Sequence, residues 1–153
     1  MHTEVSSVVQ IKQFSNKGQA MVEFAVSLVL LLIILSGIID LGRMFFYYIA
    51  MRDASQEGVM YGTINPSNCD QIEARVRTLL SDNTGVDVTI TVNGADCSTA
   101  DPTTDACSGN ELVVSVIDPD FPISMPFLGA VLGRNSITLD ATITGTILRP
   151  QCE

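Results

Sequence analysis

The chain has little of the histidine and closely spaced cysteine from which most metal and redox sites are built. Its 153 residues include one histidine, His2, and four cysteines with no CxxC pair. Zinc sites need such ligands at short spacing, so a metal-binding domain is disfavoured. The sequence also lacks a G-x-S-x-G, a Walker A and a G-x-G-x-x-G segment. We therefore predict a protein that is not an enzyme and that uses no metal ion or cofactor.

Positive charge is scarce in the second part of the chain. The net charge is −9, and twelve acidic residues stand against four arginines after residue 62. A surface of this kind repels phosphate, which argues against a nucleic-acid partner. The acidic excess instead favours solubility and mutual repulsion between copies.

Proline is absent between residues 20 and 62, and the glycines there are isolated. This stretch predicts one long helix of roughly 63 Å at 1.5 Å per residue. Within it, the sixteen residues Phe24–Ile39 carry no charge, which corresponds to about 24 Å of helix. Residues 20–22 add the turn needed to cross a hydrocarbon core of about 30 Å. Such a span brings Glu23 to the edge of the bilayer, where a charge is costly.

The residues before this helix are polar and basic. Residues 1–18 carry Lys12 and Lys17 and end in Gly18, directly before the apolar run. Basic residues before a span place its N-terminus in the cytoplasm. The apolar run is not followed by the small-residue site of an ordinary secretory signal, so cleavage at Gly18 fits better. We predict a cytoplasmic leader over 1–18, a long helix over 19–62 that is transmembrane in its first half, and an extracytoplasmic domain over 63–153.

The leader and helix carry a resemblance to a known family. The segment Lys17–Phe24 resembles the class III signal of type IV pilins, in which a peptidase cuts after glycine and glutamate stands fifth in the mature chain. Segments Gly37–Phe45 and Ala54–Gly58 are similar to TadE-like proteins, which are minor pilins or pseudopilins of tight-adherence (Flp) systems. Residues 125–129 and 137–139 match more loosely. Phe24 stands where Flp major pilins usually have tyrosine, which favours a TadE-like subunit over a major pilin.

The resemblance implies a structural subunit of an adhesive pilus or secretion filament. It implies cleavage by a prepilin peptidase between Gly18 and Gln19. Glu23, beside Phe24, would then accept a contact from the terminal amine of a neighbouring subunit. The implied partners are that peptidase, other pilin subunits, the inner-membrane assembly platform and the lipid bilayer. The implied location is the inner membrane, with the C-terminus outside, and then a pilus or the periplasm.

Two alternatives remain open at this point. In the first, Glu23 is no more than an anion at the start of a helix, where the helix dipole favours negative charge. In the second, the whole chain is an uncleaved, single-pass adhesion or binding domain.

The second half of the long helix carries a pair of charges and a stripe of small residues. Asp40 and Arg43 lie three residues apart and can pair on one face. Phe45–Tyr48 form an aromatic cluster of the kind found at membrane interfaces. The stripe consists of four residues at intervals of four: Ala50, Ala54, Gly58 and Gly62. Such a stripe permits close backbone approach, either to this chain's own sheet or to another subunit.

The remaining residues predict a small α+β domain. Asp70, with Glu73 three residues later, predicts the cap of a short amphipathic helix that ends near Asn83 and Gly85. Alternating apolar residues predict strands over 86–92, 112–117 and 137–147. We expect a pilin-like fold, in which this three-stranded antiparallel sheet packs on the end of the long helix. Residues 118–133 contain three prolines and predict a long connection.

All four cysteines fall in this domain, and an even count suits two disulfides in an oxidising compartment. Of three connectivities, we expect Cys97–Cys107, which closes a short loop between strands, and Cys69–Cys152, which ties down the chain end. The loop 96–111 also gathers four carboxylates and Asn110. Its spacing lacks the regular pattern of a calcium loop, so a solvated hairpin is favoured over a calcium site.

Overall fold

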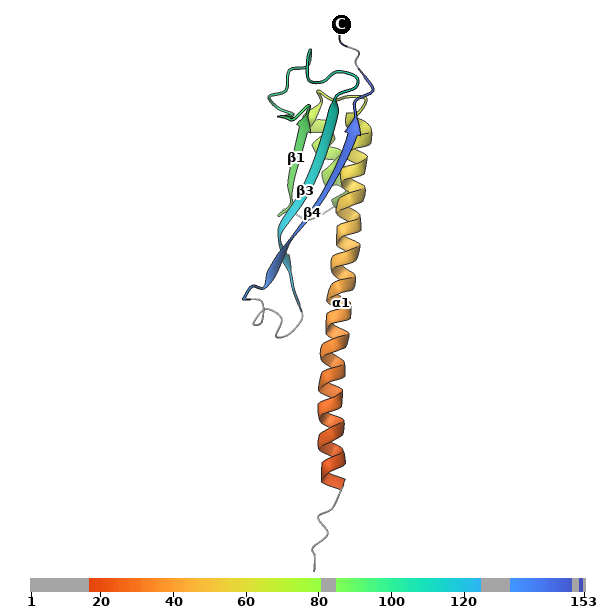
Figure 1. Ribbon diagram of the computed structural model, residues 1–153, viewed down its shortest axis with the longest axis vertical. Coiled ribbons are helices and arrows are strands. Elements are labelled where there is room, and N and C mark those ends of the chain that lie inside the picture. The colour runs from red at the N-terminus through yellow and green to blue at the C-terminus, as the bar shows by residue number, and fades with distance from the viewer. Residues whose placement is uncertain (1–16, 81–84, 125–132, 150–151, 153) are drawn as a thin grey trace, which may run out of the picture. The chain divides into compact units, whose positions relative to one another are not determined.

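The computed structural model describes residues 17–80, 85–124, 133–149 and 152. The chain divides into two units, Met1–Leu35 and Ser36–Glu153. In chain order the elements are α1 (Lys17–Gly62), α2 (Cys69–Leu80), β1 (Asp87–Val92), β2 (Ala95–Asp96), β3 (Glu111–Pro122) and β4 (Ser136–Thr146) (Figure 1). The fold is therefore α+β, with the expected long first helix and short second helix.

Helix α2 begins two residues earlier than predicted. The backbone N–H groups of Gln71 and Ile72 donate to the carbonyl of Asn68, each at 3.1 Å. Asn68 therefore flanks the helix start, and the prediction that Asp70 caps it is wrong. Asp70 lies within the first turn, where a negative charge is still favourable.

The sheet has four antiparallel strands in the order β2-β1-β3-β4, so the prediction of three is wrong. The additional strand, β2, has only two residues and pairs Ala95 with Val92 of β1. Asn93 and Gly94 form the connection, with φ of 52° and 80°. A two-residue turn with positive φ at both positions matches the twist of the strands it joins, and Asn-Gly is its commonest sequence.

Strand β3 is longer than predicted. It continues to Pro122, so the connection does not begin at Asp118 as expected; residues 125–132 lie outside the described chain. The register with β4 shifts between Asp118 and Phe121, which is a β-bulge that bends the strand. The bulge lets Phe121 turn inward, where it is 9% exposed.

One hydrophobic core lies between the helices and one face of the sheet in the second unit. Figure 1 shows the C-terminal part of α1 beside the sheet formed by β1, β3 and β4. The fully buried side chains of this core are Met51, Ile72, Val76, Val92, Leu112, Val114, Val116 and Ile147. Alternate residues of β3 are buried, as expected for a sheet with one covered face.

Helix α1 also lies very close to β4. A Cβ added at Gly145 would clash with the side chain of Val59. The hydroxyl of buried Ser55 lies 2.9 Å from the Met51 carbonyl and 3.3 Å from the Ala141 carbonyl, and donates to them. The helix thus supplies a hydrogen-bond donor to a backbone group of the sheet's last strand.

Candidate membrane and assembly surface

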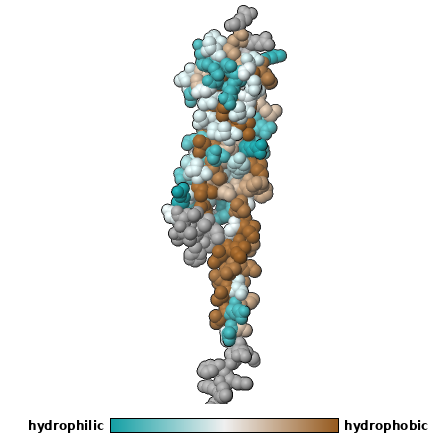
Figure 2. Space-filling model, viewed as in Figure 1, coloured by the Kyte–Doolittle hydropathy of each residue, from teal (hydrophilic) through white to brown (hydrophobic). Residues whose placement is uncertain are grey.

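The first part of α1 exposes an apolar surface in which Glu23 is the one charged residue between Met21 and Leu35. Its large hydrophobic side chains between Met21 and Leu35 are exposed by 44% (Leu28) to 75% (Met21), apart from the half-buried Ile33. Figure 2 shows this surface as the brown length of the helix. Among the described residues, Gly18–Gly62 is a helix long and apolar enough to cross a membrane. A contiguous apolar surface of this size marks a membrane or protein contact.

The residues predicted for processing and pairing lie at the start of this surface. Gly18, Gln19, Glu23 and Phe24 are all exposed on the first turns of α1. A Cβ at Gly18 would have no atom within 4 Å, so its glycine is not required by packing within the described chain. Glu23 forms no ion pair with any described residue.

Arg43 joins the residues at the end of β3 to α1. We call the group formed by Asp40, Arg43, Tyr47, Phe121 and Ser124 the Arg43 cluster. Arg43 Nη1 lies 3.5 Å from Asp40 Oδ1 and donates to Ser124 Oγ at 2.7 Å. Its guanidinium lies 5.8 Å from the centre of the Phe121 ring, which stacks on Tyr47 at 5.2 Å. Arg43 thus bridges α1 and the residues after β3, four positions beyond the end of the charge-free run.

Asp40 is only partly satisfied within this cluster. Its side chain is 15% exposed, and its Oδ2 atom is buried without a hydrogen-bond partner among the described residues. The sequence predicted the Asp40–Arg43 proximity from helical spacing. It did not predict Phe121 and Ser124, because residues 118–133 were assigned to a connection.

Two apolar grooves flank α1 beside the Arg43 cluster. One, of about 580 Å³, is lined by Ile38, Leu41, Gly42, Met44, Phe45, Tyr48 and Leu139. The other, of about 500 Å³, is lined by Ile39, Gly42, Arg43, Phe46, Tyr47 and Phe121. Gly42 borders both grooves, and a Cβ there would meet no atom within 4 Å. The exposed aromatic rings beside them, Phe45, Phe46 and Tyr48, lie where the sequence predicted a membrane interface.

The stripe of small residues packs against this chain's own domain. Ala54, Gly58 and Gly62 are buried and Ala50 is half-buried. A Cβ at Gly58 would lie 2.6 Å from Val76 Cγ2. At Gly62 it would clash with Leu112. Of the two interpretations of the stripe, the intramolecular one explains these contacts without a second subunit.

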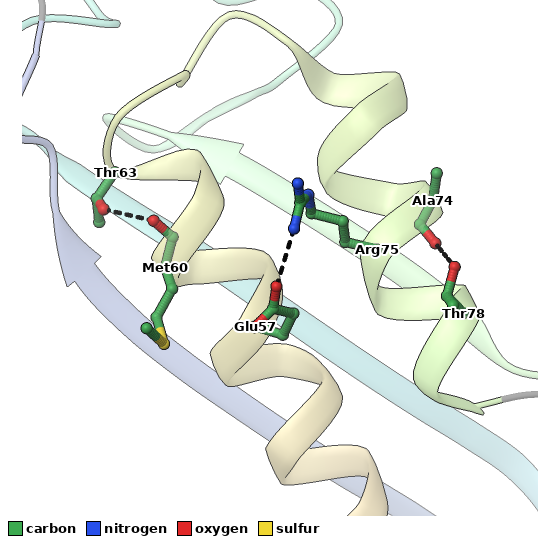
Figure 3. A network of polar contacts seen from close by, with 6 residues as sticks. All are labelled: Glu57, Met60, Thr63, Ala74, Arg75 and Thr78. Atoms are coloured by element: carbon green, nitrogen blue, oxygen red, sulfur yellow. Dashed lines mark hydrogen bonds and ion pairs between the residues drawn. The ribbon is translucent and has the colours of Figure 1, made fainter.

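Helix α2 is held to α1 by an ion pair that the sequence did not predict. Arg75 Nη1 lies 3.0 Å from Glu57 Oε1 (Figure 3). The same guanidinium lies 4.3 Å from the centre of the Tyr61 ring. Both charged side chains are about half exposed, so the pair is worth roughly 0–1 kcal/mol. The buried side chains of Ile72 and Val76 contribute more to the docking of α2.

The disulfide pairing differs from the prediction. The bonds are Cys69–Cys97 and Cys107–Cys152, so the expected Cys97–Cys107 and Cys69–Cys152 pairs are both wrong. The start of α2 lies next to the end of β2, with Cys69 and Cys97 Cα atoms 5.9 Å apart. The loop from 97 to 107 is shaped by turns and needs no bond across it. Cys107 instead holds the segment after β4.

The acidic loop 96–111 is organised by side-chain hydrogen bonds. Asp96 accepts from the hydroxyl and the N–H of Ser98, at 2.6 and 2.9 Å. Asp101 accepts in the same way from Thr103. The side-chain bond, followed by the backbone bond, lowers the pKa of Asp96 and of Asp101 below the ordinary value. Among the described residues, no three acidic, histidine or cysteine side chains are grouped to hold a metal ion.

Comparison with known proteins gives a match within helix α1. Residues 18–60 match the family of TadE-like proteins. The match confirms the resemblance drawn from the sequence over this segment. The TadE-like segment includes Gly18, Glu23, the Asp40–Arg43 pair and three of the four small residues of the stripe. The sheet domain lies outside it, and no curated protein or solved structure matches the chain.

Proposed function

We propose that this chain is a structural pilin-like subunit. A prepilin peptidase would cleave it after Gly18, and the mature subunit would be assembled into, or prime, an adhesive pilus or secretion filament. The observation that carries the proposal is the exposed apolar part of α1, which lies in the TadE-like segment. It begins directly after Gly18 and Gln19. Glu23 is its one charged residue before Asp40. The role is structural, because the chain supplies surfaces for lipid and for other subunits.

The proposed route begins in the inner membrane. The first half of α1 spans the bilayer, with the basic leader in the cytoplasm and the disulfide-bonded domain outside. A small residue at Gly18 lets the peptidase reach the scissile bond, and cleavage frees the amine of Gln19. The apolar surface then exchanges lipid contacts for contacts with neighbouring subunits. The grooves beside Gly42 offer such helices a place to pack closely.

Glu23 has the central role in assembly. Its carboxylate would accept a charge-assisted hydrogen bond from the N-terminal amine of an adjacent subunit. This contact would offset the cost of holding an ionised carboxylate in an apolar surrounding.

A pair of variants tests this role. Glu23→Ala should leave membrane insertion unchanged and lower incorporation into sheared filaments about tenfold, because a charge-assisted bond contributes roughly 1.5–3 kcal/mol. Glu23→Gln is the matched variant, because it keeps the shape of the side chain and removes only its charge. Its incorporation into filaments should be lowered as well. Quantitative immunoblots of membrane and filament fractions measure both. Normal incorporation of the two variants would refute the contact.

The second candidate function is an uncleaved, membrane-anchored adhesion domain. The exposed apolar helix alone fits it equally well, because any single-pass anchor has such a surface. The two functions differ in the fate of residues 1–18, which stay attached only in the second.

A further inference from the structure

Each disulfide of this chain joins one cysteine to the next in the sequence. Cys69 is bonded to Cys97, 28 residues later, and Cys107 to Cys152, 45 residues later. Four cysteines allow three pairings, and this is the one in which no bond skips a cysteine. The order matters for a domain that crosses a membrane with its N-terminal side first.

We propose that a disulfide-carrying thiol oxidase, in the compartment that receives the exported domain, forms both bonds during export. Each bond joins one cysteine to the next one to emerge, and no disulfide isomerase is needed. This inference rests on the proposed function, which places residues 63–153 outside the membrane.

The chemistry needs one oxidase disulfide for each bond formed. The thiolate of Cys69 attacks the oxidase disulfide, which gives a mixed disulfide and releases one oxidase thiolate. The thiolate of Cys97 then attacks the sulfur of Cys69 and expels the second oxidase thiolate. Two electrons and two protons pass from the chain to the oxidase, which leaves as a dithiol. Cys107 and Cys152 repeat the sequence with a second oxidase.

Timing selects the pairing seen in the structure. Chains are synthesised at about 5–20 residues per second, so Cys97 emerges roughly 0.5–2 s before Cys107, which lies ten positions later. By the same rate, Cys152 follows Cys107 by about 2–9 s. The mixed disulfide on Cys69 therefore meets Cys97 as its first available thiol. Cys107 in turn meets Cys152, because its earlier neighbours are already bonded.

The fold then protects the first bond. Cys97 is 7% exposed in the core, and its sulfur lies 3.6 Å from the Pro66 carbonyl. Thiol–disulfide exchange requires access to the sulfur. The native Cys69–Cys97 bond is therefore shielded from exchange once the domain has folded.

The test compares cells that lack the oxidase with cells that lack the isomerase. The full-length chain is purified from each, and its disulfides are mapped by non-reducing peptide mass spectrometry. We expect native pairing to fall more than tenfold without the oxidase and to stay unchanged without the isomerase. Loss of native pairing in isomerase-deficient cells would overturn the proposal.

A second variant tests the role of order. Thr89 lies exposed on the outer side of β1, between Cys69 and Cys97 in the chain. Thr89→Cys introduces a thiol that emerges before Cys97, so native pairing should become dependent on the isomerase. Thr89→Ser is the matched control and should behave as the natural chain does. Native pairing of Thr89→Cys in isomerase-deficient cells would contradict pairing by order.

Failure of the proposed function would give a different result. If residues 63–153 stayed in the cytoplasm, all four thiols would remain reduced in every strain, and added protease would not reach the domain in spheroplasts. That outcome would overturn both proposals. Mispairing of a protease-accessible domain would overturn only the inference about pairing.

Discussion

Among single residues, the exposed aspartates of the acidic loop show how local hydrogen bonds organise a loop. Asp96 and Asp101 each accept two bonds from the residue two positions later. These bonds favour the ionised carboxylate, which is why each pKa is lowered. Two of the four carboxylates in this loop, Asp96 and Asp101, thus act as acceptors within their own turns.

The first prediction concerns the acid sensitivity of this loop. Because the pKa of Asp96 is lower in the folded chain than its ordinary value of 3.8, the ionised form stabilises the fold. That stabilisation is complete above the ordinary value and is lost as pH falls through the lower, folded-state pKa. Ser98→Ala should raise the pKa of Asp96 towards 3.8 and leave Asp101 unchanged. Carboxyl-carbon NMR titration measures both; an unmoved Asp96 would contradict the assignment.

At the same scale, the sequence identified some partners and missed others for a clear reason. Asp40 and Arg43 lie on one helix, so helical spacing alone predicted their proximity. Phe121 and Ser124 reach the same cluster from 78 and 81 positions beyond Arg43, and no local pattern reports such a contact. The prediction of the disulfide partners failed for the same reason, because the pairing depends on the contact between the start of α2 and the end of β2.

At the scale of helices and strands, the glycines of α1 differ in what surrounds them. Gly58 is closed in by Val76, Val114 and Ile72, whereas Gly42 faces open space. The first supports packing within this chain, and the second leaves a groove for something else.

The second prediction contrasts these two glycines. Gly58→Ala should lower the free energy of unfolding by about 1 kcal/mol or more, because overpacking costs about 1–3 kcal/mol and exceeds the gain in helix propensity. Gly42→Ala should raise it by roughly 0.5–1 kcal/mol, because only helix propensity changes. Thermal unfolding of the full chain in detergent, followed by circular dichroism, compares them. Equal shifts for the two variants would show that the packing described around Gly58 is wrong.

The strands were predicted correctly where apolar and polar residues alternate regularly, and incorrectly where that alternation is interrupted. The periodic residues of β1 and β4 gave their positions within about one residue. Strand β2 is too short for a period, although Asn93 and Gly94 carry the signal of a tight hairpin turn. The prolines at 119 and 122 suggested a connection, but β3 accommodates them with a bulge and at its last residue.

For the whole molecule, a long helix with an exposed apolar first part is combined with an acidic α+β domain that carries two disulfides. The sequence predicted the long apolar helix, because the absence of charge over sixteen residues is a property of composition and needs no tertiary contact. It predicted the α+β class from the helical spacing of residues 70–80 and the alternation of apolar residues in the later strands.

The most direct test of the central claim is the mass of the mature chain. Protein sheared from cells and measured by intact mass spectrometry should begin at Gln19, and Gly18→Phe should retain the leader while Gly18→Ala is still processed. A sheared, filament-associated chain that keeps residues 1–18 would contradict the claim that this protein is a processed pilin-like subunit.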